Sequence, residues 1–163
     1  MQFTIDQVLN GSPRAVEDVL LDPAFVEARA ALPKLSDPEL LECTRDGDHA
    51  HQRIRFRFTE HVSGAVAAVV DPERLTWVDD ATFDLAAHIT EHRIEPDHYA
   101  DRLASTYRAT LTSEGEGSRR VLVGTVKVRM PLVGGKVERV IVSGLTEYAA
   151  AEETLINEWL ARS

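Results

Sequence analysis

The most chemically suggestive motif in this sequence is HITEH, which places two histidines and a glutamate at residues 88–92. The order H-x-x-E-H occurs in a class of zinc peptidases, where it lies on a helix and residues four apart present both imidazoles to one metal ion. The β-branched neighbours here predict a strand, in which His88 and His92 would stand roughly 13 Å apart at about 3.3 Å per residue. Two imidazoles at that separation cannot share a zinc ion, so we predict no metal site.

In a strand, His88, Thr90 and His92 share one face with Ile94. If that face is concave, the histidines bring polar groups to an apolar pocket, where an imidazole can orient a ligand or exchange a proton near neutral pH. If the face is convex, they are exposed to water. The sequence leaves both arrangements open, because a shift of one residue in strand register exchanges the two faces.

No other residues in the sequence form a recognisable catalytic set. There is no G-x-S-x-G motif, and Cys43 lacks the local signature of a nucleophile. The acidic pairs Asp79-Asp80 and Glu152-Glu153 are adjacent, so their side chains diverge and we expect them on solvated faces. We therefore predict no catalytic residue and no cofactor.

The element against which the predicted strands would pack is a long C-terminal helix. From residue 131 onward, apolar residues recur at the three- and four-residue spacings of a helical stripe: Val133, Val137, Val140, Ile141, Leu145, Tyr148, Leu155, Ile156 and Trp159. Such a stripe must be buried against something. Residues 40–130 are mostly typical of strands, so we expect a curved antiparallel sheet around the helix, a geometry that tends to leave a cavity.

The sequence ahead of that helix predicts a strand, two short helices and six further strands. Alternation over residues 2–7 predicts the first strand, and Ser12-Pro13 and Asp22-Pro23 are helix start signals. Turn signals then bound strands at about residues 40–45, 49–59, 75–83, 87–94, 103–112 and 119–130. Residues 59–70 predict a short helix that either plugs the core or forms a mobile lid. No linker interrupts the chain, so we expect one domain over residues 1–163.

Composition excludes several classes of function. The chain has 163 residues, 44% of them hydrophobic and 28% charged, which is typical of one globular domain. A net charge of -9 argues against nucleic acid and against anionic membrane surfaces as partners. The single cysteine, Cys43, forms no internal disulfide, and no segment resembles a signal peptide or is long and apolar enough for stable membrane insertion. We predict a cytoplasmic protein.

The element order, with its C-terminal helix gripped by a curved sheet, resembles the START-like (SRPBCC) superfamily of helix-grip folds over essentially the whole chain. The segments MQFTIDQVLNGSPRAVEDVLLDPAFVEARAAL and GTVKVRMPLVGGKVERVIVSGL are similar to a bacterial domain-of-unknown-function branch of it, and VRMPLVGGKV at residues 128–137 carries most of that likeness. The resemblance implies an α+β fold with a seven-stranded antiparallel sheet around the last helix. It also implies a pocket between the concave face, that helix and the two short helices. It supplies no catalytic residue.

Three glycines are expected to serve this architecture. Gly134 and Gly135 would let the chain swing from the last strand into the helix without a steric penalty. Gly124, inside an otherwise β-branched strand, would permit close approach of the helix.

From these observations we predict non-covalent binding of a small hydrophobic or amphipathic ligand such as a lipid, an isoprenoid or a polyketide-like molecule. Two alternatives stay open. One is a cyclase, dehydratase or hydrolase acting on a polyketide-like or aromatic substrate, with His88, His92 or Tyr107 as acid–base group. The other is a homodimeric interaction module whose core is filled by its own side chains. The predicted ligand-binding residues are Phe25, Ile54, Phe56, Phe58, His88, His92, Tyr107, Val126 and Tyr148.

Overall fold

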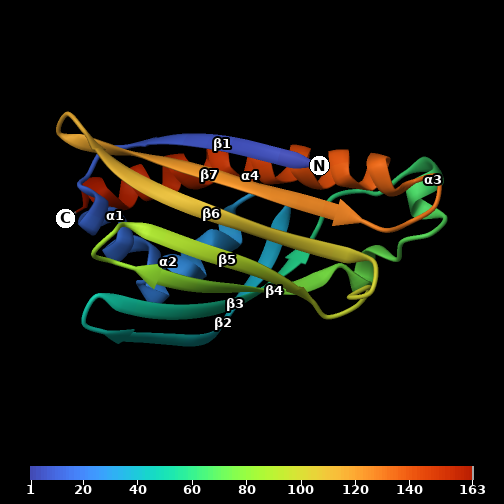
Figure 1. Ribbon diagram of the computed structural model, residues 1–163, viewed down its shortest axis with the longest axis horizontal. Coiled ribbons are helices and arrows are strands. Elements are labelled where there is room, and N and C mark those ends of the chain that lie inside the picture. Colours follow the sequence, from blue (N-terminus) through green and yellow to red (C-terminus); the bar gives the residue numbers. More distant parts are fainter. Residues whose placement is uncertain (163) are drawn as a thin grey trace.

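Seven strands of the computed structural model, which describes residues 1–162, form one antiparallel sheet in the order β1-β7-β6-β5-β4-β3-β2 (Figure 1). The strands are β1 (Gln2–Leu9), β2 (Leu35–Asp46), β3 (His49–Phe58), β4 (Thr76–Asp84), β5 (Ile89–Pro96), β6 (Leu103–Glu114) and β7 (Gly117–Val128). The helices are α1 (Pro13–Leu20), α2 (Pro23–Ala28), η1 (Arg29–Ala31), α3 (Gly64–Ala67), η2 (Pro72–Arg74) and α4 (Gly134–Ala161).

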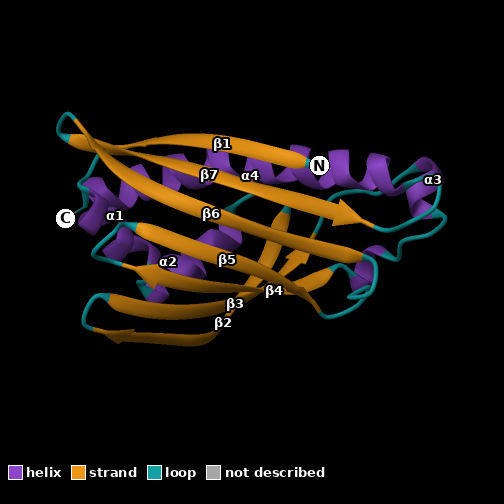
Figure 2. Cartoon of the chain, viewed as in Figure 1, coloured by secondary structure: helices purple, strands orange, loops and turns teal. Residues whose placement is uncertain are grey.

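The sheet curves around α4, and α1 and α2 lie beside the C-terminal half of that helix (Figure 2). This arrangement confirms the predicted α+β helix-grip fold, including the two short helices after the first strand. No helix within residues 1–162 is long and apolar enough to cross a membrane.

Local signals fix the starts of α1 and α2. The Ser12 hydroxyl oxygen accepts a hydrogen bond from the Ala15 amide at 3.1 Å, and the Asp22 carboxylate accepts one from the Ala24 amide at 2.9 Å. In both helices proline occupies the first turn, where its missing N–H costs nothing. These caps explain why the starts of both helices could be predicted from sequence.

The free edge of the sheet at β1 is tied to α4. The Val8 amide donates to the Glu153 carboxylate at 2.9 Å, and the Asn10 amide donates to the Asn157 side-chain oxygen at 2.8 Å. Backbone groups that an edge strand would otherwise leave unpaired are thereby satisfied. The same contacts hold the C-terminal half of α4 against the sheet.

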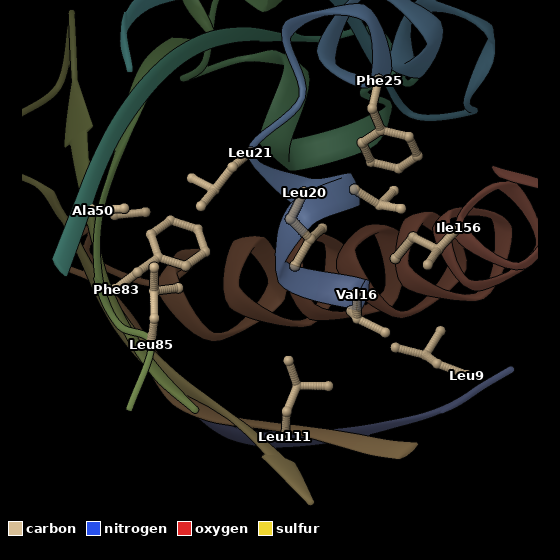
Figure 3. Packing of buried hydrophobic residues seen from close by; sticks show 12 residues of the cluster. Leu9, Val16, Leu20, Leu21, Phe25, Ala50, Phe83, Leu85, Leu111 and Ile156 are labelled. Carbon is tan, nitrogen blue, oxygen red and sulfur yellow. The ribbon is translucent and has the colours of Figure 1, made fainter. Parts of the chain in front are cut away.

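One end of the concave face is filled by a continuous hydrophobic core, which we call the closed end (Figure 3). Its buried members are Leu9, Val16, Val19, Leu20, Leu21, Phe25, Ala50, Ala81, Phe83, Leu85, Leu111 and Ile156. Phe25 meets the Trp159 ring edge-on at a centroid distance of 5.4 Å. The helices α1 and α2 therefore join the end of α4 to the sheet.

The opposite end is covered by residues 59–75, which we call the flap. The predicted helix at residues 59–70 is present only as the four residues of α3. Three valines of the flap, Val62, Val66 and Val70, form a small cluster that packs against Phe58, Leu75, Met130 and Val137. The flap rejoins the sheet where the Phe58 amide donates to the Leu75 carbonyl at 2.9 Å.

Several sequence expectations require correction. The strand expected at residues 40–45 is longer, because β2 begins at Leu35. The strand expected from residue 87 begins at Ile89, and His88 lies in the preceding turn with a left-handed backbone (φ 57°). Glycine flexibility was assigned to the hinge before α4, but there the left-handed residue is Leu132 (φ 68°).

Gly124 also serves a different purpose from the one expected. A Cβ at this position would lie 2.3 Å from Tyr107 Cβ and 2.5 Å from the Thr106 carbonyl oxygen, both on the neighbouring strand β6. The glycine therefore makes room for Tyr107 rather than for the helix. At the hinge, a Cβ on Gly134 would lie 2.6 Å from the Val128 carbonyl oxygen, so the start of α4 packs directly on the end of β7.

Candidate ligand cavity

A cavity of about 180 Å³ lies between the concave face of the sheet, α4 and the flap. Most of its wall is apolar. Aliphatic and aromatic residues from β1, β3, β7 and α4 line it, among them Ile5, Ile54, Phe56, Phe58, Leu122, Val126, Val128, Ile141 and Leu145. Several of these strand residues also pack against α4, since Ile5, Leu122 and Val126 form one cluster with Ile141 and Leu145.

Polar side chains gather on one part of the wall, around Asp79 of β4. His92 of β5 lies directly opposite Tyr107 of β6 in the strand register, and their rings stack with centroids 4.0 Å apart and planes 10° apart. His92 Nδ1 lies 2.9 Å from Asp79 Oδ1, and the Tyr107 hydroxyl donates to Asp79 Oδ2 at 2.8 Å. Because a carboxylate only accepts hydrogen bonds, the proton on Nδ1 points at Asp79, and Nε2 is left for another partner.

A second polar group, from η1, β7 and α4, adjoins the first. Arg29 Nη2 lies 3.1 Å from Glu152 Oε1, and Arg120 Nη1 lies 3.1 Å from Glu152 Oε2. Gln7 donates to the Ala149 carbonyl at 2.7 Å and accepts from Arg120 at 3.1 Å. These charges are all buried, and each has an opposite charge beside it, as a stable interior requires.

The environment sets the protonation of these groups. Burial opposes ionisation of Asp79, but the charge of His92 and hydrogen bonds from His92 and Tyr107 outweigh it, so the pKa of Asp79 lies below its ordinary value. Burial likewise opposes ionisation of Glu152, but Arg29 and Arg120 bring its pKa below the ordinary value. Burial and the nearby Asp79 raise the pKa of Tyr107 well above the usual range, and burial raises that of Tyr148. Both phenols are therefore neutral donors at neutral pH.

Three buried polar atoms of this wall have no hydrogen-bond partner among residues 1–162: Arg29 Nε, His92 Nε2 and Tyr148 Oη. Buried polar atoms in native proteins are almost always paired, with protein or with a bound molecule. The three belong to residues that line the same cavity. They form a set of unused hydrogen-bonding positions on residues of a mostly apolar wall, which also includes Arg74, His98 and Arg102.

A family model described as "Protein of unknown function (DUF2505)" matches residues 4–160. The chain belongs to this family. A search of curated protein sequences finds no match. The fold, by contrast, is shared with many solved structures.

Several of these structures share the fold along the full chain. TTHA0849 from Thermus thermophilus is 15% identical with a TM-score of 0.70, over 99% of this chain and 98% of its own. The Zhui aromatase/cyclase from Streptomyces sp. R1128 is 14% identical with a TM-score of 0.69, over 99% and 94%. Norcoclaurine synthase from Thalictrum flavum is 11% identical with a TM-score of 0.66, over 100% and 87%. The predicted START-like helix-grip fold is thereby confirmed for this DUF2505 chain.

Seven of the nine predicted ligand-binding residues lie on the cavity wall: Ile54, Phe56, Phe58, His92, Tyr107, Val126 and Tyr148. Their role in binding stays a prediction. The expected position of Phe25 is wrong, because it is fully buried in the closed end; Arg29, just after α2, is the nearby residue that reaches the cavity.

The expected position of His88 is also wrong. Its left-handed turn aims the ring at α1, where Nδ1 lies 3.0 Å from Glu17 Oε1. The other residues of the HITEH motif diverge as well, since Glu91 pairs with Arg108 and His92 contacts Asp79. Within residues 1–162 there is no group of three His, Cys, Asp or Glu side chains placed to hold a metal ion.

The acidic and cationic members of the wall were not among the predicted site residues. Asp79 was assigned to a solvated face, yet it alternates along β4 with Trp77, Ala81 and Phe83, all on the concave side. Glu152 was assigned likewise, yet it lies four residues from both Tyr148 and Ile156 on the buried stripe of α4. In both cases the spacing of the acidic residue from its buried neighbours in the same element indicated that its side chain is buried.

Proposed function

We propose that the protein binds a small amphipathic molecule without covalent chemistry, its apolar body in the cavity and its polar head beside Asp79, His92 and Tyr148. Supporting this is a mostly apolar wall that includes three residues with an unpaired buried polar atom. A ligand apolar throughout would leave those atoms buried and unsatisfied, at a cost of about 1–3 kcal/mol for each.

The unpaired atoms restrict the chemistry of the head. Arg29 Nε only donates a hydrogen bond, and the Tyr148 hydroxyl, which stays protonated, can donate one. His92 Nε2 accepts when the ring is neutral and donates when it is charged. An acceptor oxygen satisfies the first two groups, so a carbonyl, hydroxyl or carboxylate head fits this side of the cavity.

The size of the cavity suits a small ligand. A single water needs only about 10–15 Å³ of such space, so the cavity accommodates a molecule of several carbon atoms. Burial of roughly 200–300 Å² of apolar ligand surface at about 25 cal/mol per Å² gives several kcal/mol before binding costs, consistent with micromolar affinity.

The first test is mass spectrometry of the purified protein, native and then denatured. A stoichiometric small molecule released on denaturation would support binding and give the ligand class. The second test compares decanoic acid, 2-decanone and decane as competitors of a fluorescent cavity probe. We expect the two oxygen-bearing molecules to compete at least about tenfold better than decane, and the Tyr148→Phe substitution to shrink that difference. Equal competition by decane would contradict a polar head site.

A second candidate function is acid–base catalysis on the bound molecule, by a cyclase, dehydratase or hydrolase type of reaction. The observation that favours it is the pair formed by Asp79 and His92, in which the carboxylate orients the imidazole and Nε2 is left without a hydrogen-bond partner among residues 1–162. His92→Gln keeps a polar side chain but removes the titratable base. Conversion of a bound compound by the wild type and not by His92→Gln, with binding retained in both, would support the enzyme.

The cavity itself weighs against a module whose core is filled entirely by its own side chains. Homodimerisation and a cytoplasmic location stay predictions. Analytical ultracentrifugation tests the first, and fractionation of the producing cells tests the second.

A further inference from the structure

The Lys and Arg side chains of this acidic protein are not all paired with a carboxylate. Most Lys and Arg side chains lie within 4.0 Å of a carboxylate. Within residues 1–162, those with no ion pair are Arg57, Arg74, Lys127, Arg129, Lys136, Arg139 and Arg162. Four of them fall between residues 127 and 139. The acid in that segment, Glu138, is occupied by the N-terminal ammonium at 3.3 Å and the Val128 amide at 2.9 Å.

A leucine projects from the middle of this cationic segment. Leu132 is 100% exposed, in a left-handed backbone conformation that leucine rarely adopts. The loop is closed around it, because the Val133 amide donates to the Pro131 carbonyl at 2.8 Å and the Gly134 amide donates to the Met130 carbonyl at 3.0 Å. The fold therefore holds an apolar side chain out in water, with unpaired cations on both sides of it.

This segment adjoins the cavity. Met130 and Val137 line it and also pack against the valines of the flap, and Val140 lines it while staying 40% exposed. Figure 1 shows α3 and the first turns of α4 at the same end of the molecule, away from the C-terminus. Val140 thus connects the cavity lining to the surface of the same segment that carries the exposed Leu132.

We propose that residues 127–140, which we call the basic rim, dock the protein on the surface of an anionic lipid bilayer. Leu132 enters the boundary between head groups and acyl chains, and Lys127, Arg129, Lys136 and Arg139 lie against lipid phosphates. The docking is peripheral and needs no spanning segment.

A bilayer fits the rim better than an acidic protein does. Stable protein interfaces bury about 800 Å² on each partner around a broad, well-packed centre, whereas the rim offers one protruding apolar side chain with cationic residues before and after it in the sequence. The net charge of -9 led to the exclusion of anionic membranes above. That exclusion fails at contact distance, because charges farther away than the Debye length of about 8–10 Å are largely screened.

Docking at this end would let a lipophilic ligand pass between bilayer and cavity without crossing water. The docking itself does not depend on what the cavity holds, so the two proposals can fail separately. Cosedimentation with vesicles tests the rim, and the competition experiment above tests the cavity.

The experiment uses the full chain and vesicles of phosphatidylglycerol and phosphatidylcholine in equal parts, with pure phosphatidylcholine vesicles for comparison. We expect sedimentation with the anionic vesicles alone, weakened by added salt. Leu132→Ser and the double substitution Lys136→Glu/Arg139→Glu should each weaken binding roughly tenfold or more. Circular dichroism melts would show that each variant is folded.

Two matched controls separate the rim from general effects. Val8→Ser removes an apolar side chain that is 60% exposed on β1, and Arg57→Glu/Arg162→Glu makes the same change in net charge outside the rim. Both should bind like the wild type. Absence of wild-type binding to anionic vesicles, or equal loss in the controls, would overturn the proposal. Binding to polyglutamate but not to vesicles would overturn it in favour of an acidic protein partner.

Discussion

The two ends of the concave face are built from the same strands, yet one is packed solid and the other is hollow. At the closed end, α1 and α2 add Val16, Leu20 and Phe25 to a core that also includes Ile156 of α4 (Figure 3). At the cavity end, the covering flap contains only two short helical turns among the described residues, α3 with four residues and η2 with three. Side chains from such short elements cannot fill the space that the curved sheet leaves around α4.

The difference also extends to polar groups. The closed end buries Glu17 against His88, a pair that is complete in itself. The cavity end buries Arg29, His92 and Tyr148 with one unpaired atom each. One buried atom at the closed end, Ser118 Oγ on the residue paired with Leu9, is also without a partner among residues 1–162, whereas the cavity end has three such atoms on residues that line one space, as expected of a binding site. Each prediction below tests that contrast.

The largest difference in stability between the two ends is expected when a phenylalanine of each end is replaced by alanine. Phe25→Ala in the closed end should lower the free energy of unfolding by about 3–5 kcal/mol, because a fully packed ring leaves an empty volume. Phe56→Ala should cost roughly half as much, because part of this ring already borders the cavity and has fewer contacts to lose. Urea denaturation of both variants measures the difference.

In ligand binding, the order of the two substitutions should be reversed, with the larger effect from Phe56→Ala. Phe56→Ala should change the affinity for decanoic acid, whereas folded Phe25→Ala protein should change it less, because Phe25 affects the cavity only through Arg29, whose guanidinium lies 5.1 Å from the Phe25 ring centroid. Equal stability losses in the two variants would mean that the space at the cavity end is closed in solution.

A smaller effect is expected from Gly124→Ala at the polar part of the wall. The new methyl group would meet Tyr107 Cβ at 2.3 Å and force β6 and β7 apart locally. Overpacking of this kind costs about 1–3 kcal/mol. Gly115→Ala is a poor control because of its left-handed backbone, so Gly135→Ala serves instead, since its methyl group would meet nothing closer than Arg139 Nη1 at 3.8 Å.

Gly124→Ala should also displace Tyr107 from Asp79. We expect the fluorescence or NMR signals of Tyr107 to shift and the preference for an oxygen-bearing ligand to fall. An unchanged Tyr107 signal would show that the strand pair absorbs the methyl group elsewhere.

The contributions of Asp79 and Glu17 to the free energy of unfolding should change with pH in opposite directions. The pKa of Asp79 is lowered on folding, so its stabilisation is complete above the ordinary value of 3.8 and is lost as the pH falls through the folded pKa. Burial raises the pKa of Glu17 above the ordinary value of 4.5, and its hydrogen bond to His88 only partly offsets this. Glu17 therefore favours the folded state at low pH, and that contribution is lost as the pH rises above 4.5.

Substitution isolates each contribution. Asp79→Asn should remove a rise of stability with pH below 3.8, and Glu17→Gln should remove a fall of stability with pH above 4.5. Each slope is at most about 1.4 kcal/mol per pH unit. Urea midpoints from pH 2.5 to 7 provide the measurement. Slopes of the same sign in both variants would contradict the assigned environments.

More of the fold than of the candidate site could be predicted from the sequence, and the reasons are physical. Strand alternation in β1 and β3 and the caps at Ser12 and Asp22 are local signals, and the stripe of α4 is a long one, so these elements could be predicted. His88 was misplaced because strand ends depend on contacts with other elements, here its bond to Glu17 of α1.

The members of the site were predicted where they share the periodicity of apolar neighbours, as Phe56 and Tyr148 do. Asp79 and Glu152 share it too, but their charge suggested solvent, and only the tertiary partners His92, Arg29 and Arg120 make their burial tolerable. Arg29 lies in η1, a turn with no sequence pattern that would indicate the direction of its side chain. Partners of this kind come from distant parts of the chain, which a single sequence does not reveal.

The smallest effect on stability is expected from the ion pairs that hold the flap against α4. These pairs also test whether the cavity end opens. The Lys34 ammonium lies 2.6 Å from Glu60 of the flap and 2.9 Å from Glu147 of α4, so it joins the cover of the cavity to the helix. Exposed ion pairs contribute little to the free energy of unfolding, and Lys34→Met should leave the urea midpoint nearly unchanged. It should nevertheless make the flap more mobile, so that a bound fluorescent probe dissociates about two- to fivefold faster in stopped-flow measurements. Added salt should produce the same change in the wild type. Arg108→Met, which breaks an ion pair with Glu91 on the convex face, should not alter dissociation. If the rate is equal in wild type and Lys34→Met, the ligand leaves by a route that does not involve the flap, and the contrast between a closed end and an end that opens would have to be given up.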